Sequence, residues 1–152
     1  LINKFLKKNN CKIIFEPGRS IIGNAGILIS KIIYIKRNKN KNFVILDAAM
    51  NDLMRPALYG AKHQIIPSIK NKKNLNKKFE FVGPICESTD KFLTINKFQK
   101  IKEGDVLIIC DSGAYGMSLS SNYNVRPLSA EILIKNSKIQ VIRNRQKLSD
   151  LI

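Results

Sequence analysis

Apolar and polar residues alternate over short stretches along most of this chain, and the apolar positions are rich in Ile and Val. Runs of this kind, bounded by Gly, Pro, Asn and Asp, are typical of short β-strands. The predicted strands are residues 20–37, 42–48, 62–69, 79–86, 104–111, 129–134 and 138–145. Such a series predicts a mainly β fold, an antiparallel sandwich or barrel-like domain. The first strand carries two glycines, which suggests that it is bent or bulged.

The N-terminal end has a different pattern. Apolar residues at positions 1, 2, 5 and 6 predict a short helix, and "CKIIFEPGR" (11–19) predicts a short strand that runs into a Pro-Gly turn. Helix is expected to be minor elsewhere. In "AMNDLMRPALYG" (49–60) the proline disfavours a continuing helix, so a short irregular turn is predicted there. The charged run 69–78 predicts a solvated surface loop.

The length of 152 residues with 44% hydrophobic residues is enough for one sizeable core, which suggests one domain. The net charge of +16 first suggests an anionic partner such as nucleic acid. However, much of the excess is Lys accompanied by Asn and Ile, the residues that an A- and T-rich coding sequence favours. The lysines gather in the terminal segment and loops rather than beside aromatic residues on a strand. A basic nucleic-acid-binding β-domain therefore stays only as an alternative.

The three cysteines are far apart and form no CxxC pair. They predict reduced thiols in a cytosolic protein, with no metal site. No apolar run approaches the roughly 18 residues that cross a bilayer, and the N-terminus lacks the apolar core of a signal peptide. We therefore expect a cytoplasmic protein with no membrane partner. The first residue is Leu1 rather than Met, which suits a piece of a longer product.

The distinctive residues stand in turns between the predicted strands, where functional side chains are common. Arg19 and Arg55 offer planar donors suited to carboxylate or phosphate, and Glu87 offers a charge suited to an ammonium group. A ligand with both charges would satisfy this set. The structural alternatives are a Glu16–Arg19 pair, Arg55 as a surface cap, and core positions for the tyrosines at 59 and 115.

Cys86 lies beside Glu87, just after a Gly-Pro break. A thiol can hold a proton near neutral pH and still release it, and a neighbouring carboxylate favours the protonated form. Cys86 is therefore a candidate acid rather than a nucleophile, with a buried structural cysteine as the alternative. Cys11 and Cys110 lie in apolar contexts and are predicted to be core residues, and His63 has no neighbour that suggests catalysis.

Four segments together resemble one enzyme family: "FEPGRSIIGNAG", "LDAAMNDLMRPALYGA", "VGPICESTD" and "DSGAYGMSLSSNYNVRPLSAEIL". In order and spacing they are similar to the C-terminal part of the pyridoxal-phosphate-dependent ornithine, diaminopimelate and arginine decarboxylases. "MNDLMRPALY" and "CES" favour the diaminopimelate branch. The resemblance covers nearly the whole chain. It implies decarboxylation of meso-2,6-diaminopimelate to L-lysine and carbon dioxide, with pyridoxal 5'-phosphate as cofactor, in lysine biosynthesis.

The family architecture is an alanine-racemase-like (β/α)8 barrel followed by a C-terminal β-domain, in a homodimer with shared active sites. The resemblance assigns residues 1–19 to the last helix and strand of the barrel and 20–152 to the β-domain. The lysine that holds the cofactor belongs to the barrel. These residues alone are therefore expected to be inactive.

The resemblance also implies a role for each candidate residue. The cofactor-binding residues would be Glu16, Pro17, Gly18, Arg19 and Tyr115. Substrate would be held by Arg19, Arg55, Tyr59 and Tyr115, and its distal ammonium by Glu87. Cys86 would be the catalytic proton donor, and Cys86 and Glu87 would reach into the partner's site. An ornithine or arginine decarboxylase is the related alternative, and Arg55 discriminates against it, because only a second substrate carboxylate needs that cation.

Overall fold

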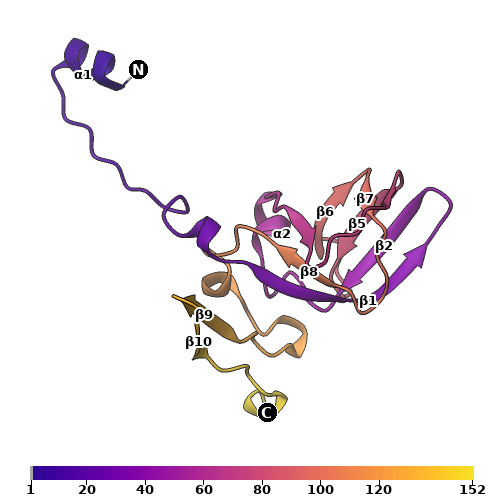
Figure 1. Cartoon of the computed structure of the whole chain (residues 1–152). Coiled ribbons are helices and arrows are strands. Elements are labelled where there is room, and N and C mark those ends of the chain that lie inside the picture. The colour runs from indigo at the N-terminus through magenta and orange to yellow at the C-terminus, as the bar shows by residue number, and fades with distance from the viewer. Residues whose placement is uncertain (1) are drawn as a thin grey trace.

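The computed structural model describes residues 2–152, and its main body is a curled six-stranded sheet (Figure 1). The strand order is β3-β8-β1-β2-β5-β6. The strands are β1 (Leu28–Arg37), β2 (Lys41–Leu46), β3 (Ile65–Pro67), β4 (Asn74–Leu75), β5 (Lys78–Val82), β6 (Lys91–Ile95), β7 (Phe98–Gln99), β8 (Val106–Ile109), β9 (Glu131–Lys135) and β10 (Lys138–Arg143). The mainly β prediction is confirmed.

Two further pairs of strands stand outside this sheet. β4 pairs with β7, and β9 pairs with β10 in an antiparallel hairpin. The hairpin turns through Asn136 and Ser137, whose φ angles of 48° and 62° suit a tight two-residue connection. Helices are few: α1 (Ile2–Asn9), α2 (Arg55–Tyr59) and 3-10 turns at Gly23–Ala25, Met117–Leu119, Tyr123–Val125 and Leu148–Asp150.

The core lies inside the curl of the main sheet. In β2 every second residue is buried, because alternate side chains of a strand point to opposite faces. Phe98 packs on Phe79 and Phe81, with ring centroids 5.9 and 5.1 Å apart. On the outer face of β5, a polar side chain is buried instead: Glu80 is only 8% exposed, and it forms ion pairs with Lys41 and Lys91. This core holds in place the turns that carry the candidate residues.

The predicted antiparallel arrangement is wrong at one pair, because β2 and β5 run parallel. The chain between them is long and contains α2, β3 and β4, so it can return to the same edge of the sheet. The bulged character of the first strand is confirmed by a register shift between Ile32 and Tyr34. However, the strand begins only at Leu28, because residues 20–27 form turns and a 3-10 helix.

Two local predictions are also wrong. Residues 11–18 form no strand, since no neighbouring strand lies beside them and most of their side chains are exposed. Accordingly Cys11 is exposed, not a core residue. At Arg55–Tyr59 a helical turn replaces the expected irregular turn, because Pro56 falls in the first turn of α2, where its missing N–H has no helical partner to lose.

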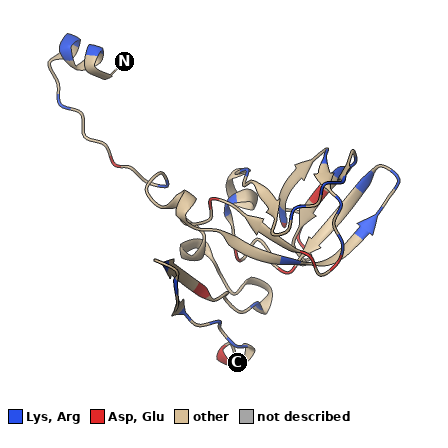
Figure 2. Ribbon diagram, in the orientation of Figure 1, with Lys and Arg blue, Asp and Glu red and all other residues tan. Residues whose placement is uncertain are grey.

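The N-terminal helix is confirmed, but it stands apart from the sheet. In Figure 1, α1 and the extended segment after it lead away from the main body. None of the residues of α1 is buried. Figure 2 shows Lys and Arg on α1 and on the strand ends and loops at the far side of the sheet.

Candidate active site

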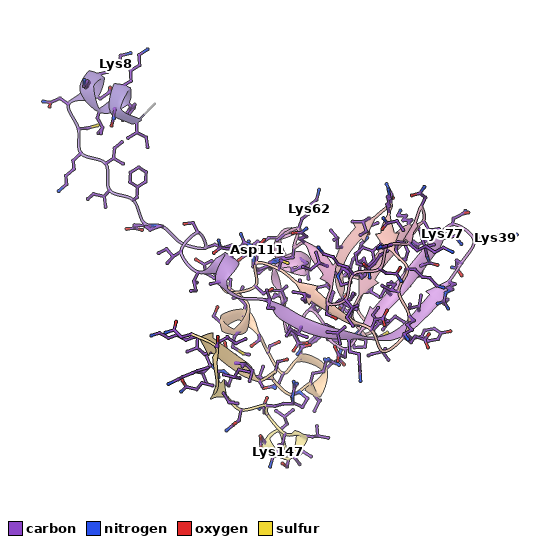
Figure 3. The ribbon with its side chains drawn as sticks, in the orientation of Figure 1. Lys8, Lys39, Lys62, Lys77, Asp111 and Lys147 are labelled. Atoms are coloured by element: carbon purple, nitrogen blue, oxygen red, sulfur yellow. The ribbon has the colours of Figure 1, made fainter. Side chains whose placement is uncertain are left out.

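Arg19 lies where the N-terminal segment joins the sheet. Its Nη2 donates a hydrogen bond to the backbone oxygen of Asp111, at 3.0 Å, just after β8. Figure 3 labels Asp111 at this junction. The Nε of Arg19 is buried and has no partner within residues 2–152. One donor of the guanidinium therefore anchors the side chain, and another is left for a ligand.

Tyr115 is held beside Gly18 by a close approach of two glycine-containing loops. The N–H of Ser112 donates to Gly26 and the N–H of Gly113 to Gly23, at 2.8 and 2.9 Å. A Cβ on Gly113 would lie 2.2 Å from the oxygen of Ile22, so no larger residue fits without a shift. Tyr115 itself has φ 57°, which is uncommon for a residue with a side chain. The loop is thus set in a specific strained geometry by its neighbours.

The Tyr115 hydroxyl in turn approaches the predicted cofactor segment. A Cβ on Gly18 would lie 3.2 Å from the hydroxyl oxygen, a tight contact. Gly18, Arg19 and Tyr115 are therefore brought together. Glu16 and Pro17 are exposed, and Glu16 makes no ion pair in the described part of the chain. The alternative of a Glu16–Arg19 pair is therefore wrong.

Arg55 joins this group from the start of α2. Its guanidinium carbon lies 5.7 Å from the ring centroids of both Tyr59 and Tyr115. Tyr59 is on the same helix, four residues on, and so projects from the same side. Cation–π attraction at such distances favours the guanidinium between two rings. The Nε of Arg55 is also buried without a partner in residues 2–152.

The two tyrosines are not core aromatics, because Tyr59 is 65% exposed and Tyr115 is 45% exposed. The structure thus brings together five of the predicted residues, and none of the five is fully buried. These residues, called here the arginine–tyrosine cluster, are Gly18, Arg19, Arg55, Tyr59 and Tyr115. A groove of about 790 Å³ elsewhere, lined by residues 67–72, 99–102 and 104–106, contains none of the predicted residues.

Cys86 and Glu87 occupy a separate turn between β5 and β6, and both are exposed. Ser88 Oγ donates to Glu87 Oε1 at 3.4 Å. Within residues 2–152, neither Cys86 nor Glu87 makes a hydrogen bond or ion pair with the arginine–tyrosine cluster. The buried alternative for Cys86 is wrong, and its thiol is accessible.

Asp90 closes this turn and was not singled out from the sequence. Its Oδ2 accepts from the N–H of Ile85 at 2.9 Å, and its Oδ1 accepts from Met50 at 2.7 Å. Burial raises the pKa of Asp90, although these hydrogen bonds act in the opposite direction. An Asp six residues after the proline of a Gly-Pro pair was the only sequence signal for such a bond.

A second unpredicted network fixes the segment that leads into α2. Asn51 accepts from Arg126 Nε at 3.0 Å and donates to the Ser121 oxygen at 3.1 Å. Asp52 pairs with Arg126 at 3.8 Å and accepts from Ser129 at 3.0 Å. The motif "MNDLMRP" therefore contains structural residues as well as Arg55. The pairing of Asn51 with Arg126 spans 75 positions and leaves no local pattern in the sequence.

The arginine–tyrosine cluster has donors that suit an anionic cofactor or substrate. Two buried arginine donors without partners in residues 2–152, one of them on Arg55 next to two tyrosine rings, suit an anionic ligand such as a phosphate or a substrate carboxylate. The arginine–tyrosine cluster thus fits one part of a site for pyridoxal phosphate and an amino acid.

His63 is buried, and its Nδ1 lies 2.9 Å from the backbone oxygen of Cys110, within hydrogen-bond distance. It therefore has a structural role.

The described residues offer neither a metal site nor a membrane-spanning helix. No group of three His, Cys, Asp or Glu residues within 2–152 is placed to hold a metal ion. No helix in the same residues is long and apolar enough to cross a membrane.

Comparison with known proteins places the chain among decarboxylases. The family described as "Pyridoxal-dependent decarboxylase, C-terminal sheet domain" matches residues 19–113. The diaminopimelate decarboxylase of Vibrio cholerae is 44% identical over 151 residues, which are 99% of this chain and 36% of that protein. The diaminopimelate decarboxylase of Zymomonas mobilis is 46% identical over 151 residues, covering 99% of this chain and 35% of that protein. The chain thus spans little more than a third of the length of these relatives.

Solved structures give the same result. The Helicobacter pylori diaminopimelate decarboxylase complexed with L-lysine matches with a TM-score of 0.84 and 43% identity, over 99% of this chain and 36% of that one. The M. jannaschii diaminopimelate decarboxylase in co-complex with L-lysine matches with a TM-score of 0.88 and 38% identity, over 99% and 35%.

Proposed function

The chain belongs to the pyridoxal-dependent decarboxylases that carry this C-terminal sheet domain, and we propose that it is the C-terminal part of a diaminopimelate decarboxylase. The reaction would convert meso-2,6-diaminopimelate to L-lysine and carbon dioxide. The similarity to curated diaminopimelate decarboxylases over almost the whole chain supports this substrate. The observation that carries the proposal is Arg55, held between Tyr59 and Tyr115 with a free buried donor.

The domain boundary is part of the proposal. Residues 1–19 would complete a (β/α)8 barrel, and residues 20–152 would form the β-domain. The exposed α1 and the extended segment after it support this division, because alone they bury no core. The barrel would supply the lysine that holds the cofactor, so these 152 residues by themselves would not catalyse the reaction.

The residues of the arginine–tyrosine cluster would bind and orient the reactants. Arg19 and Arg55 would each offer a planar donor to a carboxylate of the substrate, and Tyr115 would touch both cofactor and substrate. Gly18 leaves room beside the Tyr115 hydroxyl for this approach. The bidentate donors distinguish a substrate with a second carboxylate from ornithine or arginine, which lack one.

Pyridoxal phosphate, when bound, supplies a ring that accepts the electron pair released as carbon dioxide leaves the α-carbon. Glu16 would hold a proton on the pyridine nitrogen, with Pro17 shaping that turn. Cys86 Sγ would donate a proton to the α-carbon, and Glu87 would accept hydrogen bonds from the distal ammonium. Because both are exposed and make no described hydrogen bond or ion pair with the arginine–tyrosine cluster, we propose that they serve the partner's site in a cytoplasmic homodimer.

The test is lysine production by a complete protein. This chain is fused to the N-terminal part of the Vibrio cholerae relative, and lysine formation from meso-diaminopimelate is measured with added pyridoxal phosphate. The parent fusion should make lysine, and Cys86→Ala should lower kcat by about 10²- to 10⁴-fold, the usual contribution of a positioned acid, with cofactor absorbance retained. Cys11→Ala is the matched control, because Cys11 is also exposed. A folded, cofactor-bound fusion that makes no lysine would refute the proposal.

A further inference from the structure

Asp90 joins two turns of the chain through its two carboxylate oxygens. Its side chain is almost fully buried, at 3% exposure. One oxygen accepts from Ile85 at 2.9 Å and the other from Met50 at 2.7 Å. These donors are backbone groups 35 positions apart in the chain. A single side chain therefore sets the separation of two segments.

Both segments lead directly into candidate site residues. Ile85 precedes Cys86 and Glu87, and Met50 begins the turn that continues into α2 with Arg55. Among the described residues, only one hydrogen bond besides that of Asp90 joins residues 83–90 to residues 49–59. It is a weak one from Thr89 Oγ1 to the Met50 sulfur, at 3.8 Å.

The backbone around Asp90 is built to hold this side chain inside the turn. Its own N–H donates to the Glu87 oxygen at 3.1 Å, and its oxygen accepts from the N–H of Gly83 at 3.0 Å. A Cβ on Gly83 would lie 2.2 Å from Oδ2. Glycine at 83 thus leaves the space that the carboxylate occupies.

The charges around the carboxylate fit an anchoring role. Burial opposes the ionised form of Asp90 and raises its pKa, and the nearby Asp52 acts in the same direction. The N–H bonds from Ile85 and Met50, and the Arg126 guanidinium, act the other way. A buried carboxylate whose two oxygens are both used by backbone donors stabilises the geometry of those donors.

We propose that Asp90 is a positioning residue that fixes the Cys86–Glu87 turn relative to the Arg55 helix. This role rests on the proposed function. Asp90 would not contact the substrate. It would act through the placement of Cys86 and Glu87. A small misplacement of a proton donor is enough to slow a reaction strongly.

The first test needs no catalysis and uses the 152-residue chain. Backbone amide exchange is measured in Asp90→Asn, which keeps the size of the side chain but replaces one acceptor oxygen by an N–H₂ group. We expect about 10-fold or faster exchange at Ile85 or Met50, with unchanged exchange at core amides such as Val44. Gly83→Ala should give the same local effect, because the added Cβ displaces Asp90 without changing its charge.

The matched control is Asp105→Asn. Asp105 also accepts from a nearby backbone N–H, that of Lys102 at 2.9 Å, but in a different turn. It should leave exchange at Ile85 and Met50 unchanged. Unchanged exchange in both Asp90→Asn and Gly83→Ala would overturn the anchoring, and equal acceleration at Val44 would show a general loss of stability instead.

The second test uses the fusion that makes lysine. Asp90→Asn should lower kcat by about 10- to 100-fold, in line with the loss from a slight misplacement, with cofactor absorbance and stability of the core retained. Asp105→Asn should leave kcat unchanged. Fast exchange at Ile85 or Met50 with unchanged kcat and KM would overturn the positioning role. If the parent fusion itself makes no lysine, the proposed function fails, and the exchange rates still decide whether Asp90 anchors the two turns.

Discussion

Two guanidinium groups define what the arginine–tyrosine cluster can bind. The Nε atoms of Arg19 and Arg55 are buried, and neither has a partner in residues 2–152. A buried donor without an acceptor destabilises a fold by about 1–3 kcal/mol, and more when it is charged. Both donors would gain an acceptor from an anionic ligand. The geometry of these residues therefore favours a ligand with more than one acidic group.

Glu87 is the matching charge of opposite sign. In the complete protein, Glu87→Gln should raise KM for diaminopimelate by about 10-fold or more, since a hydrogen bond to a charged group contributes about 1.5–3 kcal/mol. Cofactor binding, followed by absorbance, should not change. Glu103→Gln is the control, because within residues 2–152 its Oε1 accepts only from the Ile35 N–H. An unchanged KM in Glu87→Gln would remove the contact with the distal ammonium.

The three cysteines differ in access to solvent. Cys11 and Cys86 are exposed, whereas Cys110 is half-buried. Burial, and then the neighbouring Asp111, raise the pKa of the Cys110 thiol. Because the thiolate is the reactive form, alkylation near pH 7.5 should modify Cys11 and Cys86 at least about 10-fold faster than Cys110. Peptide mass spectrometry measures the alkylation rate of each cysteine. Denaturant should abolish the difference between these rates. Equal rates in the folded chain would contradict this placement.

Elements were predicted well where a local pattern decided them. The strands that became β2, β3, β5, β8, β9 and β10 follow from their apolar runs and flanking turns. β6 and β7 were not predicted, because residues 91–99 mix lysines with apolar residues and contain no sharp break. The expected strand at 11–19 failed for a different reason. A strand needs a neighbour, and propensity alone does not show whether one is present.

The site was predicted through its resemblance to a family, and the family match over residues 19–113 confirms that resemblance. The individual roles of all the candidate site residues stay predictions. The structural roles of Asp90 and Arg126 could not be predicted from the sequence, because they depend on hydrogen bonds to segments far away along the chain. Burial of a polar group is a property of the folded chain, and no residue type reports it alone.

The close contact of two loops gives an element-scale prediction. Gly113→Ala should destabilise the chain by about 3 kcal/mol, because its Cβ would lie 2.2 Å from the Ile22 oxygen and backbone must shift. The shift should also move Tyr115. Gly60→Ala is the control: Gly60 has φ 63° and open space, so only about 1 kcal/mol of strain is expected. Denaturant unfolding measures both. Equal losses would show that the loops can separate freely.

Glu80 links three neighbouring strands and gives a pH-dependent prediction. It pairs with Lys41 of β2 and Lys91 of β6, each at 2.6 Å. Burial raises the pKa of Glu80, but the bonds from Lys41 and Lys91 outweigh it and lower the pKa overall. A lowered pKa in the folded state contributes stability that is present above the unfolded pKa and lost as pH falls through the folded pKa.

Glu80→Gln should therefore lower the free energy of unfolding by about 1 kcal/mol at pH 7, a value reduced for the partial exposure of both lysines. The difference from the parent should shrink as pH falls below about 4, the range where glutamate becomes protonated. Glu131→Gln is the control, since its pair with Arg143 is exposed on the hairpin. Denaturant titrations at several pH values measure this, and a difference that is constant with pH would contradict the assignment.

At the scale of the whole molecule, the N-terminal segment lacks a core of its own. The helix α1 is eight residues long and buries none of them. Ile2, Phe5, Ile14 and Phe15 are each more than half exposed. An isolated helix of this length is marginal in water, because nucleation outweighs the few hydrogen bonds that follow. Apolar residues exposed along a segment also favour burial against a partner surface.

We propose that the barrel provides this partner surface. Amide exchange in the 152-residue chain and in the fusion tests this. In the 152-residue chain, the amides of residues 2–15 should exchange at nearly the rate of an unfolded peptide. In the fusion with the Vibrio cholerae barrel they should exchange at least about 100-fold more slowly, because a docked helix opens only with the domain around it. Amides of β2 serve as the internal reference in both proteins. Strong protection in the 152-residue chain would reveal a contact that α1 does not make here. An absence of protection in a lysine-producing fusion would place the domain boundary before residue 2, since residues 2–15 would then contribute nothing to the barrel.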